Sequence, residues 1–96
     1  MTPALVLTTT ACAYGLAPSL LRGRSRRRQV AEARAVAAFV AYDLTPASYT
    51  ELARELGRAR STTVGIVSGV DERLRMLSPR WTRAVERVER LLRPAG

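Results

Sequence analysis

Apolar residues recur along most of this chain at spacings of three and four, the period of one buried face of an α-helix. The clearest case is residues 29–44, in which the spaced positions are Val30, Ala33, Ala37, Val40 and Leu44, widened by Val36 and Phe39. No segment alternates apolar and polar residues with the period of two that marks a strand. The pattern therefore predicts an all-α fold, a compact bundle of about five helices.

Residues that begin or end helices divide the chain. Pro3 favours a helix that runs to about Tyr14, where Gly15 ends it, and Thr45-Pro46 stops the long helix. We expect a single domain over residues 1–96. In order, its parts are an N-terminal helix and connector (1–21), a basic loop (22–28), a long helix (29–45), a helix-turn-helix (48–77) and a closing helix (79–93).

The segment 48–77 follows the plan of a helix-turn-helix. Ser48 and Glu51 form a capping box, so the first helix begins there and ends at Gly57. The inner face of this helix is predicted to be Tyr49, Leu52, Ala53 and Leu56. Arg58-Ala59-Arg60 is the turn, and Ser61 is placed to cap the second helix.

The register of the second helix points to a longer turn than usual. In the tightest form of the motif the buried positions lie six and nine residues after the glycine, here Thr63 and Ile66. The apolar stripe lies one residue later, at Val64, Val67, Val70 and Leu74. We therefore expect a turn lengthened by one residue.

In the closing helix the apolar face is Trp81, Val85, Val88 and Leu92, after a Ser78-Pro79 start. Arginines at 73, 75, 83, 87 and 90 interleave with acids at 71, 72, 86 and 89. This spacing is typical of an ordinary salt-bridged helix surface.

The charge adds a function to this fold. The chain carries 16 basic residues, all arginine, against 8 acidic ones, which gives a formal charge of +8. Five of the seven residues from 22 to 28 are arginines, with no acid among them. Such a balance is typical of nucleic-acid binders, although an anionic membrane or an acidic protein would also attract it.

The chain has few of the residues that serve in catalysis or metal binding. There is no His, and the one cysteine, Cys12, lies in an apolar stretch where we expect a small buried residue in a reducing cytoplasm. We expect no enzyme activity, no metal site and no cofactor. Residues 3–18 are too short and too rich in Thr to span a membrane.

The segment from Arg24 to Val70 resembles the C-terminal DNA-binding domain of the bacterial replication initiator DnaA, and the resemblance covers roughly residues 10 to 75. The positions that match in register are Val30, Ala31, Arg34, Leu44, Thr45, Thr62, Thr63 and Val64. The resemblance implies a TrpR/DnaA-C-like fold in which a basic-loop arginine enters the minor groove. Arg26 corresponds to that arginine, with Arg24 as a neighbouring alternative, and Arg34 to one that approaches the DNA backbone.

The resemblance departs at the start of the recognition helix. Arg60 and Ser61 stand where the family has Asp and His, which exchanges an acceptor that favours cytosine for a donor that favours guanine. This chain also lacks the G-x-x-x-x-G-K-S/T motif of the family's ATPase part. It looks like the DNA-reading module alone, as also occurs in small stand-alone bacterial proteins and fused to some transposases.

The first interpretation is therefore sequence-specific binding of double-stranded DNA in the cytoplasm, at the nucleoid, in replication or transcription control or for a mobile element. We expect no membrane or small-molecule partner and slightly favour a monomer. The predicted DNA contacts are Arg24, Arg26, Arg27, Arg28, Arg34, Arg58, Arg60, Ser61, Thr62 and Thr63. The alternative interpretation is a small helical adaptor that binds an acidic protein partner.

Overall fold

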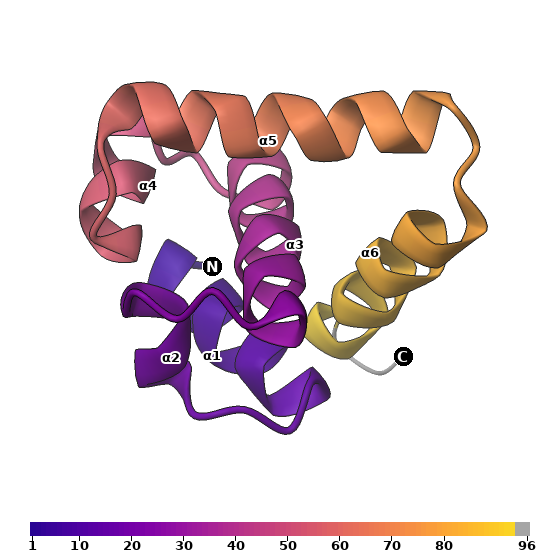
Figure 1. The fold of residues 1–96 in the computed structure, drawn as a ribbon, viewed down its shortest axis with the longest axis horizontal. Helices are drawn as coiled ribbons and strands as arrows, with labels where there is room; N and C mark the ends of the chain where they lie inside the picture. The colour runs from indigo at the N-terminus through magenta and orange to yellow at the C-terminus, as the bar shows by residue number, and fades with distance from the viewer. Residues whose placement is uncertain (94–96) are drawn as a thin grey trace.

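The structure is a computed structural model that describes residues 1–93, and within this range all regular structure is helical (Figure 1). The helices are α1 (Pro3–Ala13), α2 (Pro18–Arg22), α3 (Arg28–Leu44), α4 (Tyr49–Leu56), α5 (Arg60–Arg75) and α6 (Pro79–Leu92). The predicted all-α bundle is confirmed. It has one helix more than expected, since the connector contains α2.

Helix α3 is the centre of the bundle and contacts each of the other five helices. In Figure 1 it runs down the middle, with α5 across its upper end, α1 and α2 near its lower end and α6 to the right. The stripe predicted from Val30 to Val40 is buried except for Phe39, which is half-buried, and Ala38 and Ala41 on the adjoining faces are buried too. These small side chains allow neighbouring helices to approach α3 closely from several sides.

The prediction that Leu44 belongs to the buried stripe is wrong. Leu44 is 38% exposed, because it is the last residue of α3 and the chain turns away at Thr45. Thr45 is buried instead, and its hydroxyl donates a hydrogen bond of 2.6 Å to the carbonyl of Ala41.

The N-terminal segment folds largely as expected. Gly15 ends α1 with a φ of 68°, in the left-handed region that favours glycine. Pro18 occupies the first turn of α2, where its missing N–H costs nothing, and the helix forms because it buries Leu21 completely. The prediction for Cys12 is wrong: α1 buries Val6, Leu7, Thr10 and Ala11, and Cys12 lies exposed outside that face.

The first helix of the helix-turn-helix has the predicted capping box. Ser48 Oγ accepts from the amide of Glu51, and the Glu51 carboxylate accepts from the amide of Ser48, both at 3.2 Å. Helix α4 buries Leu52, Ala53 and Leu56, while Tyr49 is half-buried. Gly57 then ends the helix with a φ of 65°.

The second helix begins earlier than expected. Its cap is Ala59, with no side-chain hydrogen bond, so the prediction that Ser61 caps α5 is wrong. Thr63 is fully buried, as the tight spacing requires, and Val64 is only half-buried. At the next inner position Val67 is buried rather than Ile66. The first buried position, Thr63, is therefore the one expected for the tight turn, and the second, Val67, is the one expected for the lengthened turn.

The closing helix has the predicted inner face. Val85 and Val88 are buried, while Trp81 and Leu92 pack against the core from its edge. The Ser78 side chain forms no capping hydrogen bond. No helix within residues 1–93 is both long and apolar enough to cross a membrane.

Candidate nucleic-acid interface

The basic loop, residues 23–27, links α2 to α3 and carries exposed arginines. Arg24, Arg26 and Arg27 of the loop are exposed, as is Arg28 in the first turn of α3. None of these four forms an ion pair with another residue in the range 1–93. Because like charges this close repel each other, contacts from elsewhere must hold the loop in shape.

Arg34 supplies most of these contacts from inside the molecule. It is only 7% exposed, and its Nε donates to the carbonyl of Leu21 at 2.8 Å. Its Nη2 lies within 3.1–3.3 Å of three further carbonyls, those of Leu20, Gly23 and Ser25. Burial lowers the pKa of Arg34, and the charge of Arg58 lowers it further.

The structure gives Arg34 a role within the protein, and the DNA contact expected of it stays a prediction. Its guanidinium donates hydrogen bonds to carbonyls of α2 and the loop, and these bonds hold the loop backbone in its shape. The sequence held a clue to this role. Arg34 follows Val30 by four residues and precedes Ala37 by three, so it lies on the inward stripe of α3.

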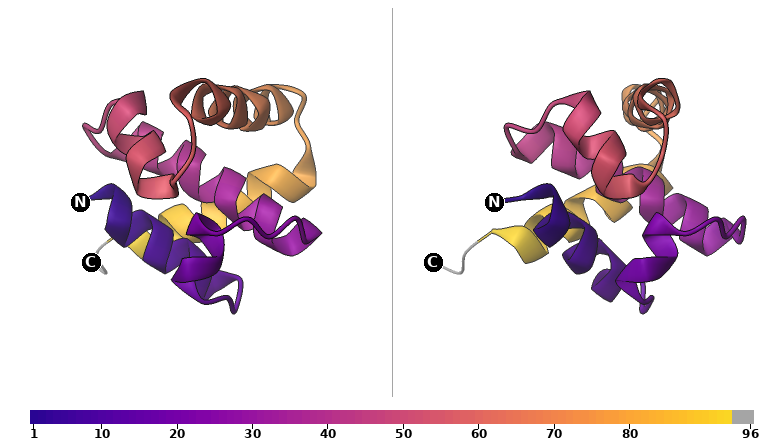
Figure 2. Two further views of the ribbon diagram at one scale, coloured as in Figure 1. Left: turned by 60° about the vertical axis from the view of Figure 1, so that its left-hand side comes forward. Right: turned by 90° about the vertical axis from the view of Figure 1, so that its left-hand side faces the viewer.

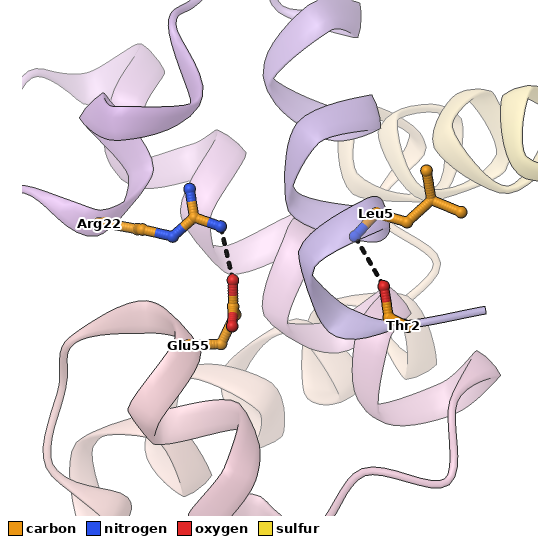
Figure 3. A network of polar contacts seen from close by, with 4 residues as sticks. All are labelled: Thr2, Leu5, Arg22 and Glu55. Carbon is orange, nitrogen blue, oxygen red and sulfur yellow. Dashed lines mark hydrogen bonds and ion pairs between the residues drawn. The ribbon is translucent and has the colours of Figure 1, made fainter.

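Arg58, in the turn of the helix-turn-helix, also points at this segment rather than outward. Its Nη1 lies 3.4 Å from the carbonyl of Arg22, and its Nη2 donates to that of Gly23. A second connection is the ion pair of 2.5 Å between Arg22 on α2 and Glu55 on α4, shown in Figure 3. The helix-turn-helix is therefore joined to α2 through the Arg22 and Glu55 side chains, and to the basic loop through Arg58 and the loop backbone.

Gly57 contributes to the same junction by having no side chain. A Cβ at this position would lie 3.4 Å from the carbonyl of Arg22, so the turn approaches α2 at contact distance. The left-handed φ of Gly57 also strains any other residue there. The glycine predicted as a helix end thus also sets how closely the loop and turn meet.

The loop and the turn line one open hollow of about 360 Å³. Its lining residues are Arg24, Ser25, Arg26, Arg34, Gly57, Arg58 and Ala59. Helix α5 begins at the next residue, Arg60, so the loop and the start of α5 lie on the same side of the molecule. Figures 1 and 2 show this side, with the turn running from α4 up to α5 above the loop.

The first turn of α5 presents polar side chains and free amides. Arg60, Ser61 and Thr62 are exposed, and no side chain caps the helix. The amides of an uncapped first turn have no partner within the helix and attract anions. The Arg60 guanidinium lies 5.9 Å from the ring centre of Tyr49, which stacks on Tyr42 at 4.1 Å. This contact restricts where Arg60 can reach.

Thr63 is a further predicted contact residue whose side chain faces the interior of the protein. Its side chain has no exposed surface, and its hydroxyl donates a 3.0 Å hydrogen bond to the carbonyl of Ala59. The reason is helical phase, because Thr63 precedes the buried Val67 by one turn. Thr63 therefore anchors the start of α5 to the core, and Thr62 is the threonine that faces solvent.

Comparison with known proteins matches the sequence of this chain to one family. The family described as "Bacterial dnaA protein helix-turn-helix" matches residues 3–67, from α1 into the middle of α5. The chain is 35% identical over 88 residues to the chromosomal replication initiator protein DnaA of Deinococcus deserti, covering 92% of this chain and 19% of that protein. It is 36% identical over 69 residues to the same protein of Deinococcus radiodurans, covering 72% and 15%. The chain thus spans less than a fifth of these relatives.

Proposed function

The chain belongs to the bacterial DnaA helix-turn-helix family of DNA-binding domains, and we propose that it binds double-stranded DNA sequence-specifically. In this proposal the first turn of α5 enters the major groove. The basic loop contacts the backbone or minor groove of the same duplex.

The observation that carries the proposal is the hollow shared by the loop and the turn. A duplex can be gripped by both segments only if they lie on one side of the protein. The contacts of Arg34 and Arg58 hold the loop backbone at that place while leaving the guanidiniums of Arg26 and Arg27 exposed. Guanidinium groups in this state suit forked contacts to phosphate.

Base reading falls to the exposed residues of the first turn of α5. We assign it to Arg60, Ser61 and Thr62. An arginine there favours guanine in the major groove, and the Thr62 methyl is suited to contact the methyl group of thymine. Because the resemblance implied Asp and His at the first two positions, we expect a preferred site that differs from the family's usual one.

The names of the relatives suggest a biological role. Two of these are named as replication initiators, and this chain corresponds to less than a fifth of each. We propose that it supplies DNA reading without catalytic activity, in replication or transcription control or as the DNA-reading part of a mobile-element protein.

In-vitro selection of bound duplexes from a random pool, followed by an anisotropy titration across salt, tests the proposal. We expect one enriched motif. If about five to seven arginines meet phosphates, the logarithm of the affinity falls against log salt with a slope of about −5 to −6. Absence of binding at low salt, or affinity that ignores salt, contradicts DNA binding. Binding without an enriched motif contradicts sequence specificity alone.

A further inference from the structure

A second arginine-rich surface lies where α6 packs beside the start of α3. It borders two hollows, of about 470 Å³ and 210 Å³, which share Glu32 and Arg80 and therefore adjoin. The arginines that line them, named here the α6 face, are Arg28, Arg73, Arg80, Arg83 and Arg87. All but Arg28 lie beyond residue 67, where the family match ends.

The structure does not pair the α6 arginines in the way the sequence pattern suggested. Arg80 pairs at 2.6 Å with Glu32 of α3, not with an acid of its own helix. Within residues 1–93, Arg83 and Arg87 form no ion pair. Glu86 and Glu89 line a separate hollow with Arg90 and Arg93. The α6 face is therefore positively charged rather than neutralised.

Several groups on the α6 face are held in fixed positions. The Arg73 guanidinium lies 4.7 Å from the ring centre of Trp81. Glu32, whose side chain is 14% exposed, receives Arg80 on one oxygen and a 2.7 Å hydrogen bond from the Tyr14 hydroxyl on the other. One carboxylate, already occupied, thus stands among five guanidiniums. Arginines that are oriented before binding lose less freedom when they meet a phosphate.

We infer that the α6 face is a second phosphate-binding surface, which contacts the DNA backbone flanking the site that α5 reads. This inference rests on the proposed function. Continuity favours the same duplex as the ligand, because Arg28 directly follows the exposed Arg26 and Arg27 of the basic loop and also lines the α6 face. An acidic protein is a less suitable ligand, because a protein interface needs exposed apolar surface. The large apolar side chain here, Trp81, is half-buried and already contacts Arg73.

The test compares two duplexes that carry the same selected site, one of about 12 base pairs and one of about 30. The variant is Arg83→Gln with Arg87→Gln, which removes two exposed charges and none of the ion pairs within residues 1–93. We expect it to bind the short duplex as the unsubstituted protein does. On the long duplex the salt slope should shrink by about 2, roughly 0.9 for each lost phosphate contact.

The matched control is Arg90→Gln with Arg93→Gln, which removes the same charge and no ion pair within residues 1–93, from exposed residues that line neither hollow. On the long duplex, the affinity of the control variant should fall more steeply with salt than the affinity of the first variant. Equal slopes for the two variants on the long duplex would overturn the inference, since the effect would be one of net charge. So would equal losses on both duplexes. Failure of the unsubstituted protein to bind either duplex would instead refute the proposed function itself.

Discussion

The two segments that we propose to contact DNA are held in place in opposite ways. The basic loop has little regular structure of its own, and its shape depends on Arg34 and Arg58, which donate to carbonyls from residues 20 to 25. The first turn of α5 is instead part of a regular helix, anchored by the buried Thr63 and Val67. Residues whose donors face the protein's own carbonyls therefore shape the loop, whereas the exposed residues at the start of α5 are not needed to hold that helix in place.

The largest effect is expected for Arg34→Met, which keeps much of the side-chain volume and removes all the hydrogen bonds to the loop. Four carbonyls lose a charged donor, so the free energy of unfolding should fall by about 3 kcal/mol, measured by urea denaturation. DNA affinity should fall with it, because the loop loses its shape. Arg34→Lys, which keeps the charge, serves as the control. Normal stability with lost DNA affinity would mean that Arg34 meets DNA directly, as the resemblance implied.

The second test removes charge from the loop without touching its support. Arg26→Gln with Arg27→Gln should lower the salt slope by about 2, on selected and random duplexes alike. Because both side chains are exposed and make no ion pair within residues 1–93, stability should change by less than about 0.5 kcal/mol. A loss confined to the selected duplex would show that the loop reads sequence.

The two threonines at the start of α5 separate anchoring from reading. Thr63→Ala should cost about 1–2 kcal/mol of stability, because it leaves a small cavity and removes the hydrogen bond to Ala59. Thr62→Ala should leave stability unchanged and reduce discrimination between selected and random duplexes by about 1 kcal/mol. Melting curves and paired anisotropy titrations measure both quantities. The opposite assignment of effects would mean that α5 is rotated relative to this structure.

The smallest expected effect lies away from both segments. Leu77, in the turn between α5 and α6, is 81% exposed and has a φ of 57°, a left-handed conformation at the helix end that glycine adopts without strain. Leu77→Gly should raise the free energy of unfolding by about 0.3 kcal/mol, seen by thermal denaturation, because relief of the left-handed strain is partly offset by the greater freedom of glycine in the unfolded chain. DNA affinity and its salt slope should stay unchanged. Any change in binding would place this turn within the interface.

Local signals in the sequence were enough for most of the helices. The capping box at Ser48, the glycines that end α1 and α4, and the apolar spacing of α3 and α6 each depend on residues within a turn or two of one another. Predictions failed where a single turn had to be placed exactly. Ser61 is a good capping residue by type, but the cap of α5 is Ala59, two residues earlier. Packing against α4, which Ser61 does not reveal, sets where the helix begins.

Among the predicted DNA contacts, residue type predicted the exposed arginines of the loop and the polar start of α5. It did not show that Arg34, Arg58 and Thr63 use their donors within the protein, since nothing in the identity of an arginine or a threonine tells whether its donors face solvent or the protein's own carbonyls. Only the position of Arg34 on the inward stripe of α3 hinted at the answer. The connection between Arg22 and Glu55, 33 residues apart, left no local pattern at all.

By itself, then, the sequence determined the helices, the positive charge and the presence of a basic loop before a helix-turn-helix, because these depend on composition and on neighbours along the chain. The tertiary structure decided which arginines bond within the protein and which stay exposed, and that the loop and the start of α5 share one side. It also decided that the α6 arginines gather around one occupied carboxylate. The reason is that a guanidinium finds its partner by distance in space, and that distance exists only once the helices have packed.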